Sequence, residues 1–289
     1  MWTRPLALLA PFILLYTANA GGQVLYVDGD ATGPGKDGSA WCSAYLHLQD
    51  ALAEAEGSDG SITEIRVAQG IHRPDQGTGQ TAGDRSASFQ LVNGTALRGG
   101  YAGCGEPDPD ARDLFLYETT LSGDLAQNDG PDFVNYDENA YTIVTGSGTD
   151  ATAVLEGFTI RSGHANGQNG AAYSGAGMYN NAGSPTITRC TFVGNVAVRY
   201  GGAIHNIFDA SPTITNCRFI ANVSFFWGGA MHVNRSSPKL INCMFSGNSA
   251  YEGGAVSAFR ADPELTNCTI AGNLAYNGGG IYAQKGGEA

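Results

Sequence analysis

Apolar and polar residues alternate over very short stretches in the second half of the chain. In "TITNCRF", Ile214, Cys217 and Phe219 are separated by polar residues, and Asn216 stands between the two apolar groups. A period of two is typical of a strand with one buried face, and asparagine tolerates the left-handed backbone of a tight turn. The pattern predicts two very short strands whose apolar residues point inward, with Asn216 in the bend between them.

This pattern recurs in four consecutive units, which begin at Ser184, Ser211, Ser237 and Asp262. One cysteine recurs per unit at steps of 27, 26 and 25 residues, and one asparagine keeps the same steps: Cys190, Cys217, Cys243 and Cys268, with Asn195, Asn222, Asn248 and Asn273. A residue type that returns once per unit indicates that the units stack in register.

Each unit is too short for a strand, a crossover helix and a second strand, but it holds strand signals around "TIT", "CRF" and "GGAMH". We expect one coil of three short strands per unit, each strand pairing with its equivalents in the neighbouring coils about 4.8 Å away. The predicted fold is all-β, a right-handed parallel β-helix. The hand is taken from the general preference of parallel crossovers.

Stacking in register turns each repeated position into a column. We expect two apolar columns inside the tube: Ile187, Ile214, Leu240 and Leu265, and Phe192, Phe219, Phe245 and Ile270. Two amide ladders are expected to satisfy buried turn backbone: Asn216, Asn242 and Asn267, and the asparagine column that starts at Asn195. The paired glycines of each unit permit a bend that a Cβ would obstruct.

The first half carries strand signals less regularly, at residues 64–72, 88–101, 119–125, 141–146 and 153–163. Before them, Leu48, Ala51, Leu52 and Ala55 share one face of a predicted helix, which we expect to cover the first coil. We divide the chain into an N-terminal strand and capping helix (21–60), irregular coils with long loops (61–183) and regular repeats (184–289). Since no cap follows the last repeat, we expect a truncated array.

Residues 1–20 form a predicted signal peptide. Arg4 precedes an apolar run from Leu6 to Leu15, and Ala18-Asn19-Ala20 is a small-x-small cleavage pattern. The apolar run is too short to span a bilayer. We therefore expect an exported protein, secreted or at the cell surface in association with an outer membrane, and no membrane span in the mature chain.

The net charge of −12 argues against nucleic acid, anionic lipid and acidic polysaccharide as partners. The content of valine, isoleucine, phenylalanine and tyrosine argues against a disordered chain. We expect a monomer whose partner is an extracellular glycan or a surface protein.

The phrases "GGAI", "GGAM" and "GGAV", with "FVGN", "FIAN" and "FSGN", resemble the GGA[ILV] and FxxN repeats of the polymorphic outer membrane proteins. From about Leu25 to its end the chain resembles bacterial right-handed β-helix surface proteins of the pectate-lyase-like superfamily. The resemblance implies the β-helix fold, and it implies adhesion or passenger domains as roles. The sequence shows no C-terminal transporter barrel or sorting domain.

An enzyme is the alternative, a polysaccharide lyase before a glycoside hydrolase, because β-helices also carry such activities. The acids of the repeats are Asp209, Glu252, Asp262 and Glu264, and they form no convincing pair of opposed carboxylates. "RSGHANG", with His164, resembles the Gly-His-Gly of polygalacturonases, but the other residues of that motif are missing. We therefore interpret His164 as an ordinary loop histidine and expect no catalytic residue.

We expect no cofactor beyond a possible structural calcium ion. The densest acidic stretch, "GDLAQNDGPDFVNYDE", offers hard oxygen ligands at Asp124, Asn128, Asp129 and Asp132, and its acids in a lyase would lie from Asp124 to Glu138. A solvated acidic loop is the alternative. "DGDATG" at Asp28 lacks the remaining ligands of an EF-hand loop, and we interpret it as a turn.

The cysteines fall into two groups. Cys42 and Cys104 lie outside the repeats and are a candidate disulfide in an oxidising compartment. The repeat cysteines form a column with Cβ spacings nearer 4.8 Å than the roughly 3.8 Å of a disulfide, so we expect buried free thiols.

The candidate binding residues lie just before the paired glycines of two adjacent units: Arg199, Tyr200, Phe225, Phe226 and Trp227. Exposed aromatic side chains on neighbouring coils make a platform on which sugar rings or a protein could stack. Packing on one another or on a loop is the alternative. Our first functional hypothesis is a non-catalytic adhesion or glycan-binding surface.

Overall fold

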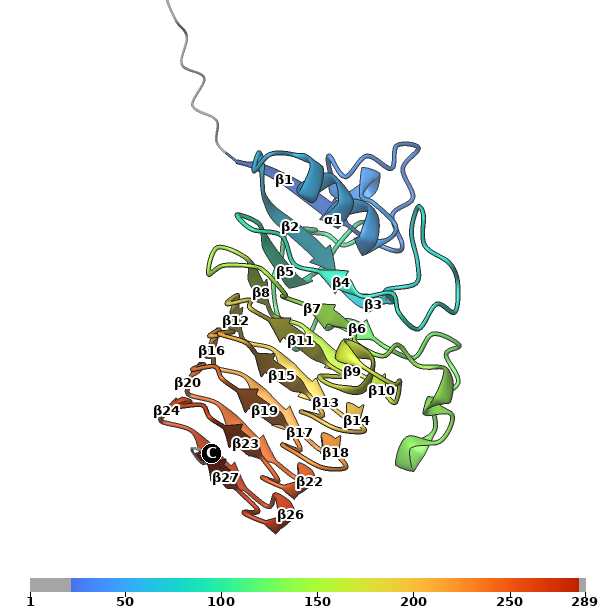
Figure 1. The fold of residues 1–289 in the computed structure, drawn as a ribbon. Helices are drawn as coiled ribbons and strands as arrows, with labels where there is room; N and C mark the ends of the chain where they lie inside the picture. Colours follow the sequence, from blue (N-terminus) through green and yellow to red (C-terminus); the bar gives the residue numbers. More distant parts are fainter. Residues whose placement is uncertain (1–21, 286–289) are drawn as a thin grey trace, which may run out of the picture.

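The computed structural model describes residues 22–285, and the predicted signal peptide lies outside them. Figure 1 shows a stack of coils that runs from the N-terminal end at β1 and α1 to β24, β26 and β27 at the opposite end. The strands pair in parallel in four sheets that follow the stack, which confirms the predicted β-helix.

We name the sheets A to D. Sheet A has eight strands: β1 (Gln23–Val27), β2 (Ile62–Ala68), β5 (Ala96–Tyr101), β8 (Val154–Glu156), β12 (Thr186–Thr188), β16 (Thr213–Thr215), β20 (Lys239–Ile241) and β24 (Glu264–Thr266). Sheet B has seven: β3 (Gly70–His72), β6 (Thr119–Ser122), β9 (Thr159–Arg161), β13 (Thr191–Val193), β17 (Arg218–Ile220), β21 (Met244–Ser246) and β25 (Thr269–Ala271).

Sheet C also has seven strands: β4 (Phe89–Gln90), β7 (Val144–Thr145), β11 (Met178–Asn181), β15 (Ile204–Ile207), β19 (Met231–Asn234), β23 (Val256–Phe259) and β27 (Ile281–Gln284). Sheet D has five: β10 (His164–Ala165), β14 (Val196–Ala197), β18 (Val223–Ser224), β22 (Ser249–Glu252) and β26 (Leu274–Asn277). Short 3-10 turns lie at Trp41–Ser43, Pro131–Phe133, Tyr136–Glu138 and Gly170–Tyr173.

A regular coil therefore has four strands, and the prediction of three was wrong. The additional strands belong to sheet D, where β14 and β18 are only two residues long. Two residues cannot show a period of two, so these strands left no pattern in the sequence. A bend at the paired glycines separates sheet D from sheet C. At Gly228, φ is +67° and a Cβ would lie 2.1 Å from the carbonyl oxygen of Met231.

The apolar columns fill the tube as predicted. Ile214 pairs with Ile187 and Leu240, and Phe219 pairs with Phe192 and Phe245. The three phenylalanines are fully buried, and their rings stack 5.2 and 4.7 Å apart with interplanar angles of 9° and 7°. Side chains thus form a continuous core along the axis, which stabilises each coil through its neighbours.

One of the two predicted amide ladders is buried. Asn195 Nδ2 donates to Asn222 Oδ1 at 3.0 Å, and Asn222 Nδ2 donates to Asn248 Oδ1 at 3.0 Å and to the carbonyl of Phe192 at 2.9 Å. The ladder at Asn216 also forms, and Asn216 has the expected left-handed φ of 55°. The Asn216 side chain is exposed, however, so this ladder lies on the outside of the tube.

The capping helix is α1 (Leu48–Gly57). Leu48, Ala51, Leu52 and Ala55 are buried against the first coils, as the helical pattern predicts. Near this cap, a disulfide joins Cys42 to Cys104, and the repeat cysteines are free thiols. In the described part of the chain, we find no helix with the length and apolar character needed to cross a bilayer.

Candidate functional site

An aromatic column lies on the outer surface, at the corner between sheets D and C. Tyr200 and Trp227 occupy equivalent positions of adjacent coils, and Glu252 takes that position in the next coil. The rings of Tyr200 and Trp227 stack with centroids 5.0 Å apart and an interplanar angle of 14°. Trp227 is thus the last ring of this column.

Two histidines lie beneath the aromatic column on the outer face of sheet C. His205 and His232 pair in register on β15 and β19, and the Tyr200 ring stacks on them with centroids 5.1 and 4.8 Å away. Each histidine is 2% exposed, and none of their four ring nitrogens has a hydrogen-bond partner among the described residues. Unpaired buried nitrogens are costly, so a histidine of this pair that borders an open space is a candidate for binding a ligand.

Burial also sets the charge of this pair. It lowers the pKa of His232 to about 3 and holds the pKa of His205 well below its usual range, with a smaller contribution from the neighbouring His232. Both imidazoles are therefore neutral at pH 7. A neutral imidazole has one donor and one acceptor nitrogen.

A hollow of about 250 Å³ opens beside Trp227 and His232. Its floor contains Ser257, which follows His232 in the outer column of sheet C and is itself followed by Tyr282. The other lining residues are Tyr200, Asn234, Ala258, Phe259 and Gln284. Aromatic faces and a few neutral polar groups thus enclose a space of ring size.

The remaining candidate binding residues lie around this corner. Arg199 is exposed, and its guanidinium lies 5.8 Å from the ring centre of Tyr200. Phe225 and Phe226 are exposed, and Phe226 packs at 5.4 Å against Trp227. Phe225 belongs to a second stripe, over sheet D, which continues at Tyr251 and Tyr276. The structure therefore brings Arg199, Tyr200, Phe226 and Trp227 together and directs Phe225 to a neighbouring surface.

The candidate metal ligands are only partly brought together. Carboxylate oxygens of Asp124, Asp129 and Glu138 lie within 4.8 Å of one another. The backbone N–H of Asn128 donates to Asp124 Oδ1 at 3.1 Å, so this residue helps to shape the loop. Asp132 lies outside the group of three, in the turn at Pro131–Phe133. Glu138 thus replaces Asp132 in the acidic group.

Partial burial, opposed by the bonds from Asn139 and Ser162, raises the pKa of Asp129, and the nearby Asp124 raises it further. Burial and the same acidic neighbours raise the pKa of Glu138. A carboxyl with a raised folded-state pKa destabilises the fold above that pKa, and the penalty vanishes as the pH falls below the ordinary value near 3.8.

We therefore expect Asp129→Asn to have a higher free energy of unfolding than the wild type at pH 7, by less than about 1 kcal/mol, since Asp129 is only partly buried and solvent screens its charge. The difference should narrow as the pH falls and close at about pH 3, below the ordinary pKa of 3.8. In addition, if calcium binds here, calcium should raise the melting temperature of the wild type and not of the variant. Thermal melting at both pH values, in EDTA and in calcium, measures this; a variant that melts lower at pH 7 would contradict the pH prediction.

His164, the other candidate from the sequence, lies in β10 and is half-buried. Its Nδ1 lies 2.8 Å from the carbonyl oxygen of Tyr136, and burial is the main reason that its pKa is lowered. It anchors the loop that contains Glu138.

Comparison with known protein families shows one match. The family described as the right-handed beta helix region matches residues 134–289. The chain belongs to the right-handed β-helix family. The match begins within the irregular coils and covers all four repeats. No curated protein and no solved structure matches the chain.

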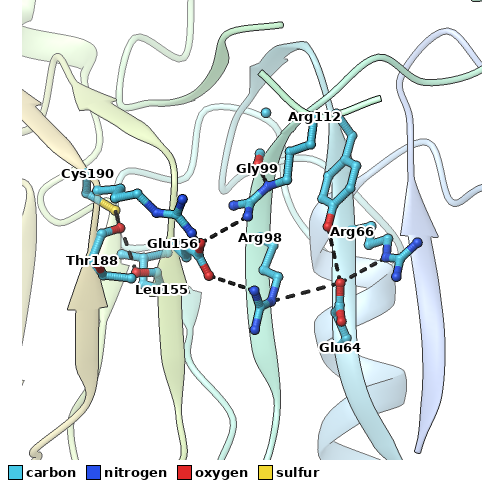
Figure 2. Close-up of polar contacts among 12 residues, drawn as sticks. Glu64, Arg66, Arg98, Gly99, Arg112, Leu155, Glu156, Thr188 and Cys190 are labelled. Carbon is cyan, nitrogen blue, oxygen red and sulfur yellow. Dashed lines mark hydrogen bonds and ion pairs between the residues drawn. The ribbon is translucent and has the colours of Figure 1, made fainter. Parts of the chain in front are cut away.

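Among the described residues, the largest ion network lies on the outer face of sheet A (Figure 2). Glu156, with a side chain 4% exposed, accepts from Arg98 at 2.9 Å, from Arg112 at 3.0 Å and also from Arg189. Arg98 also lies 3.9 Å from Glu64. Since the Glu156 carboxylate is buried and bound by three arginines, it ties β5, β8 and the end of β12 together and does not resemble a free general acid or base.

Sequence reasoning missed His205, His232 and Ser257. A signal was present, because the histidines stand at the same position of two consecutive units, "GGAIHN" and "GGAMHV". The next two units have Ser257 and Tyr282 at this position, so the coil does not require a histidine there. A histidine that is nevertheless repeated in two adjacent units is therefore a signal of function. In this β-helix protein it marks the surface beside the aromatic column.

Proposed function

We propose that this β-helix protein is exported and binds an extracellular glycan or a surface protein without catalysing a reaction. The observation that carries the proposal is the aromatic column of Tyr200 and Trp227, which ends beside an uncharged hollow on the outer surface. Aromatic rings on a rigid scaffold offer apolar contact area with little entropy loss on binding.

Two further features support this role. The strands of adjacent coils are hydrogen-bonded throughout the repeats, so the corner residues are held on a stiff surface. The GGA[ILV] and FxxN phrases resemble repeats of polymorphic outer membrane proteins, for which adhesion is the implied role. Such a surface fits a protein that holds a partner at a cell boundary.

Replacing Trp227 with alanine is expected to lower binding to a glycan array or to cells by about tenfold, since a good aromatic contact contributes roughly 0.5–1.5 kcal/mol beyond the buried area. The melting temperature should change little, because Trp227 lies at the outer surface and is only partly buried. Phe208→Ala is the matched control: this ring is 47% exposed and lies after β15, beyond the far end of sheet C from Trp227. Unchanged binding by the Trp227 variant, or an equal loss in the control, would contradict the proposal.

The second candidate is a polysaccharide-active enzyme, a lyase before a hydrolase. It is favoured by the convergence of Asp124, Asp129 and Glu138, of which two have raised pKa values, with the charge of Arg161 also acting on Asp129. Incubation with a panel of polysaccharides, with and without calcium, tests it. Product formation that is lost in Asp129→Asn would establish this function; no product from any polysaccharide would remove it.

A further inference from the structure

The hollow beside Trp227 arises because two columns lose their rings in the same coil. The corner column runs Tyr200, Trp227, Glu252, and the outer column of sheet C runs His205, His232, Ser257. The rings above this coil pack closely: Tyr200 covers both histidines, and the Trp227 ring centre lies 6.4 Å from that of His232. The hollow is therefore the place where the next ring of the stack would lie.

One side chain that lines the hollow, His232, also lacks hydrogen-bond partners among the described residues. His232 is 98% buried, and neither of its ring nitrogens has a protein partner in the described part of the chain. The neutral imidazole offers one donor and one acceptor. A hydroxyl group can bond to either nitrogen, since it can donate a hydrogen bond to the acceptor nitrogen or accept one from the donor nitrogen. Asn234 and Gln284 add amide groups at the same hollow.

The charges around the hollow argue against an ionic ligand. Its lining residues, all within the described chain, include no lysine, arginine, aspartate or glutamate. Glu252, the nearest acid of the corner column, already accepts from Trp227 Nε1 at 2.8 Å and from Asn277 Nδ2 at 3.4 Å. The net charge of −12 adds a general repulsion of anions. A ligand that stacks on Trp227 and forms hydrogen bonds without charge is favoured.

We infer that the hollow binds one neutral pyranose ring, stacked against Trp227 and hydrogen-bonded to His232 above Ser257. A pyranose combines an apolar face of C–H groups with hydroxyls around its edge, which matches an aromatic wall next to an unpaired imidazole. This inference rests on the proposed function and deepens it, because it assigns the ligand class and the one coil that binds it.

The histidine pair supplies a matched set of variants. His232→Phe keeps a ring under Tyr200 and removes both unpaired nitrogens of the histidine that borders the hollow. His205→Phe makes the same change at a residue that is equally buried and equally covered by Tyr200 but does not line the hollow. Ser257→His continues the histidine column and fills the hollow. Neither phenylalanine variant is expected to melt lower than the wild type, since each removes buried unpaired nitrogens.

The test is calorimetric titration with the methyl glycosides of glucose, galactose, mannose and N-acetylglucosamine. We expect at least one glycoside to bind the wild type and His205→Phe with equal Kd. The Kd of His232→Phe should be at least about tenfold higher, since a buried hydrogen-bonding group is lost. Ser257→His should show no binding. Equal binding by His232→Phe and the wild type would overturn the inference. Binding of p-cresol, an aromatic ring that is not a sugar, without binding of any glycoside would overturn it as well.

A glycan array separates this inference from the proposed function. If the wild type binds the array through Trp227 and Ser257→His binds equally well, the pyranose site is wrong and the glycan-binding surface stands. If the wild type binds neither the array nor cells, the proposed function and the pyranose site both fail.

Discussion

Replacing Phe219 with alanine is expected to lower the free energy of unfolding by about 3–5 kcal/mol, the usual cost of truncating a buried phenylalanine. Phe219 is fully buried between Phe192 and Phe245, with stacked rings on both sides. The hydrogen-bonded strands hold the coils at a fixed spacing, so neighbouring rings cannot move in to fill the cavity. Denaturant unfolding of the two proteins measures the difference.

Phe226→Ala is the control for this prediction. Phe226 lies in the same coil, but its side chain is 46% exposed, and its removal should cost less than about 1 kcal/mol. If the two variants lose the same amount of stability, the phenylalanine column is not the core that supports the coils.

The second large effect is expected at the cap. Changing both Cys42 and Cys104 to serine should lower the free energy of unfolding by about 3–4 kcal/mol, because the disulfide closes a loop between residues 62 positions apart and restricts the unfolded chain. Mass mapping without reductant checks that the bridge is present in the purified protein, and unfolding of the variant measures its contribution.

Cys268→Ser is the matched control, since Cys268 is a free, partly exposed thiol of the last repeat. We expect it to unfold nearly as the wild type does. Free thiols at both Cys42 and Cys104 in protein purified without reductant, or equal stability of the double variant and the wild type, would show that the cap does not depend on the bridge.

The core of the fold could be predicted because it repeats. Ile214 and Phe219 recur in each unit with an apolar equivalent, and Leu48, Ala51 and Leu52 follow the helical period, so local pattern and final burial agree. The fourth strand of the coil could not be predicted, because sheet D begins with two-residue strands such as Val223–Ser224, which are too short to show a period.

The binding surface was only half predictable. Trp227 could be predicted as a surface candidate, because aromatic residues directly precede the paired glycines in two adjacent units. The hollow depends on how side chains from sheet C, such as His232 and Ser257, approach that corner across a bend. The acidic group was only partly predictable for a similar reason. Glu138 lies near Asp124 because a long loop folds back, and no sequence spacing indicates that approach.

The unequal lengths of the coils have a consequence for how such a protein can diversify. Between sheets C and A, Ile207 and Thr213 pair with Asn234 and Lys239, so the second of these coils is one residue shorter at that corner. Before the paired glycines, Val223 and Trp227 pair with Ser249 and Glu252, so the next coil is one residue shorter there. The strands between these corners keep their pairing. Insertions and deletions can therefore accumulate at the corners while the tube remains unchanged, and recombination between units could exchange one set of surface residues for another without refolding the core.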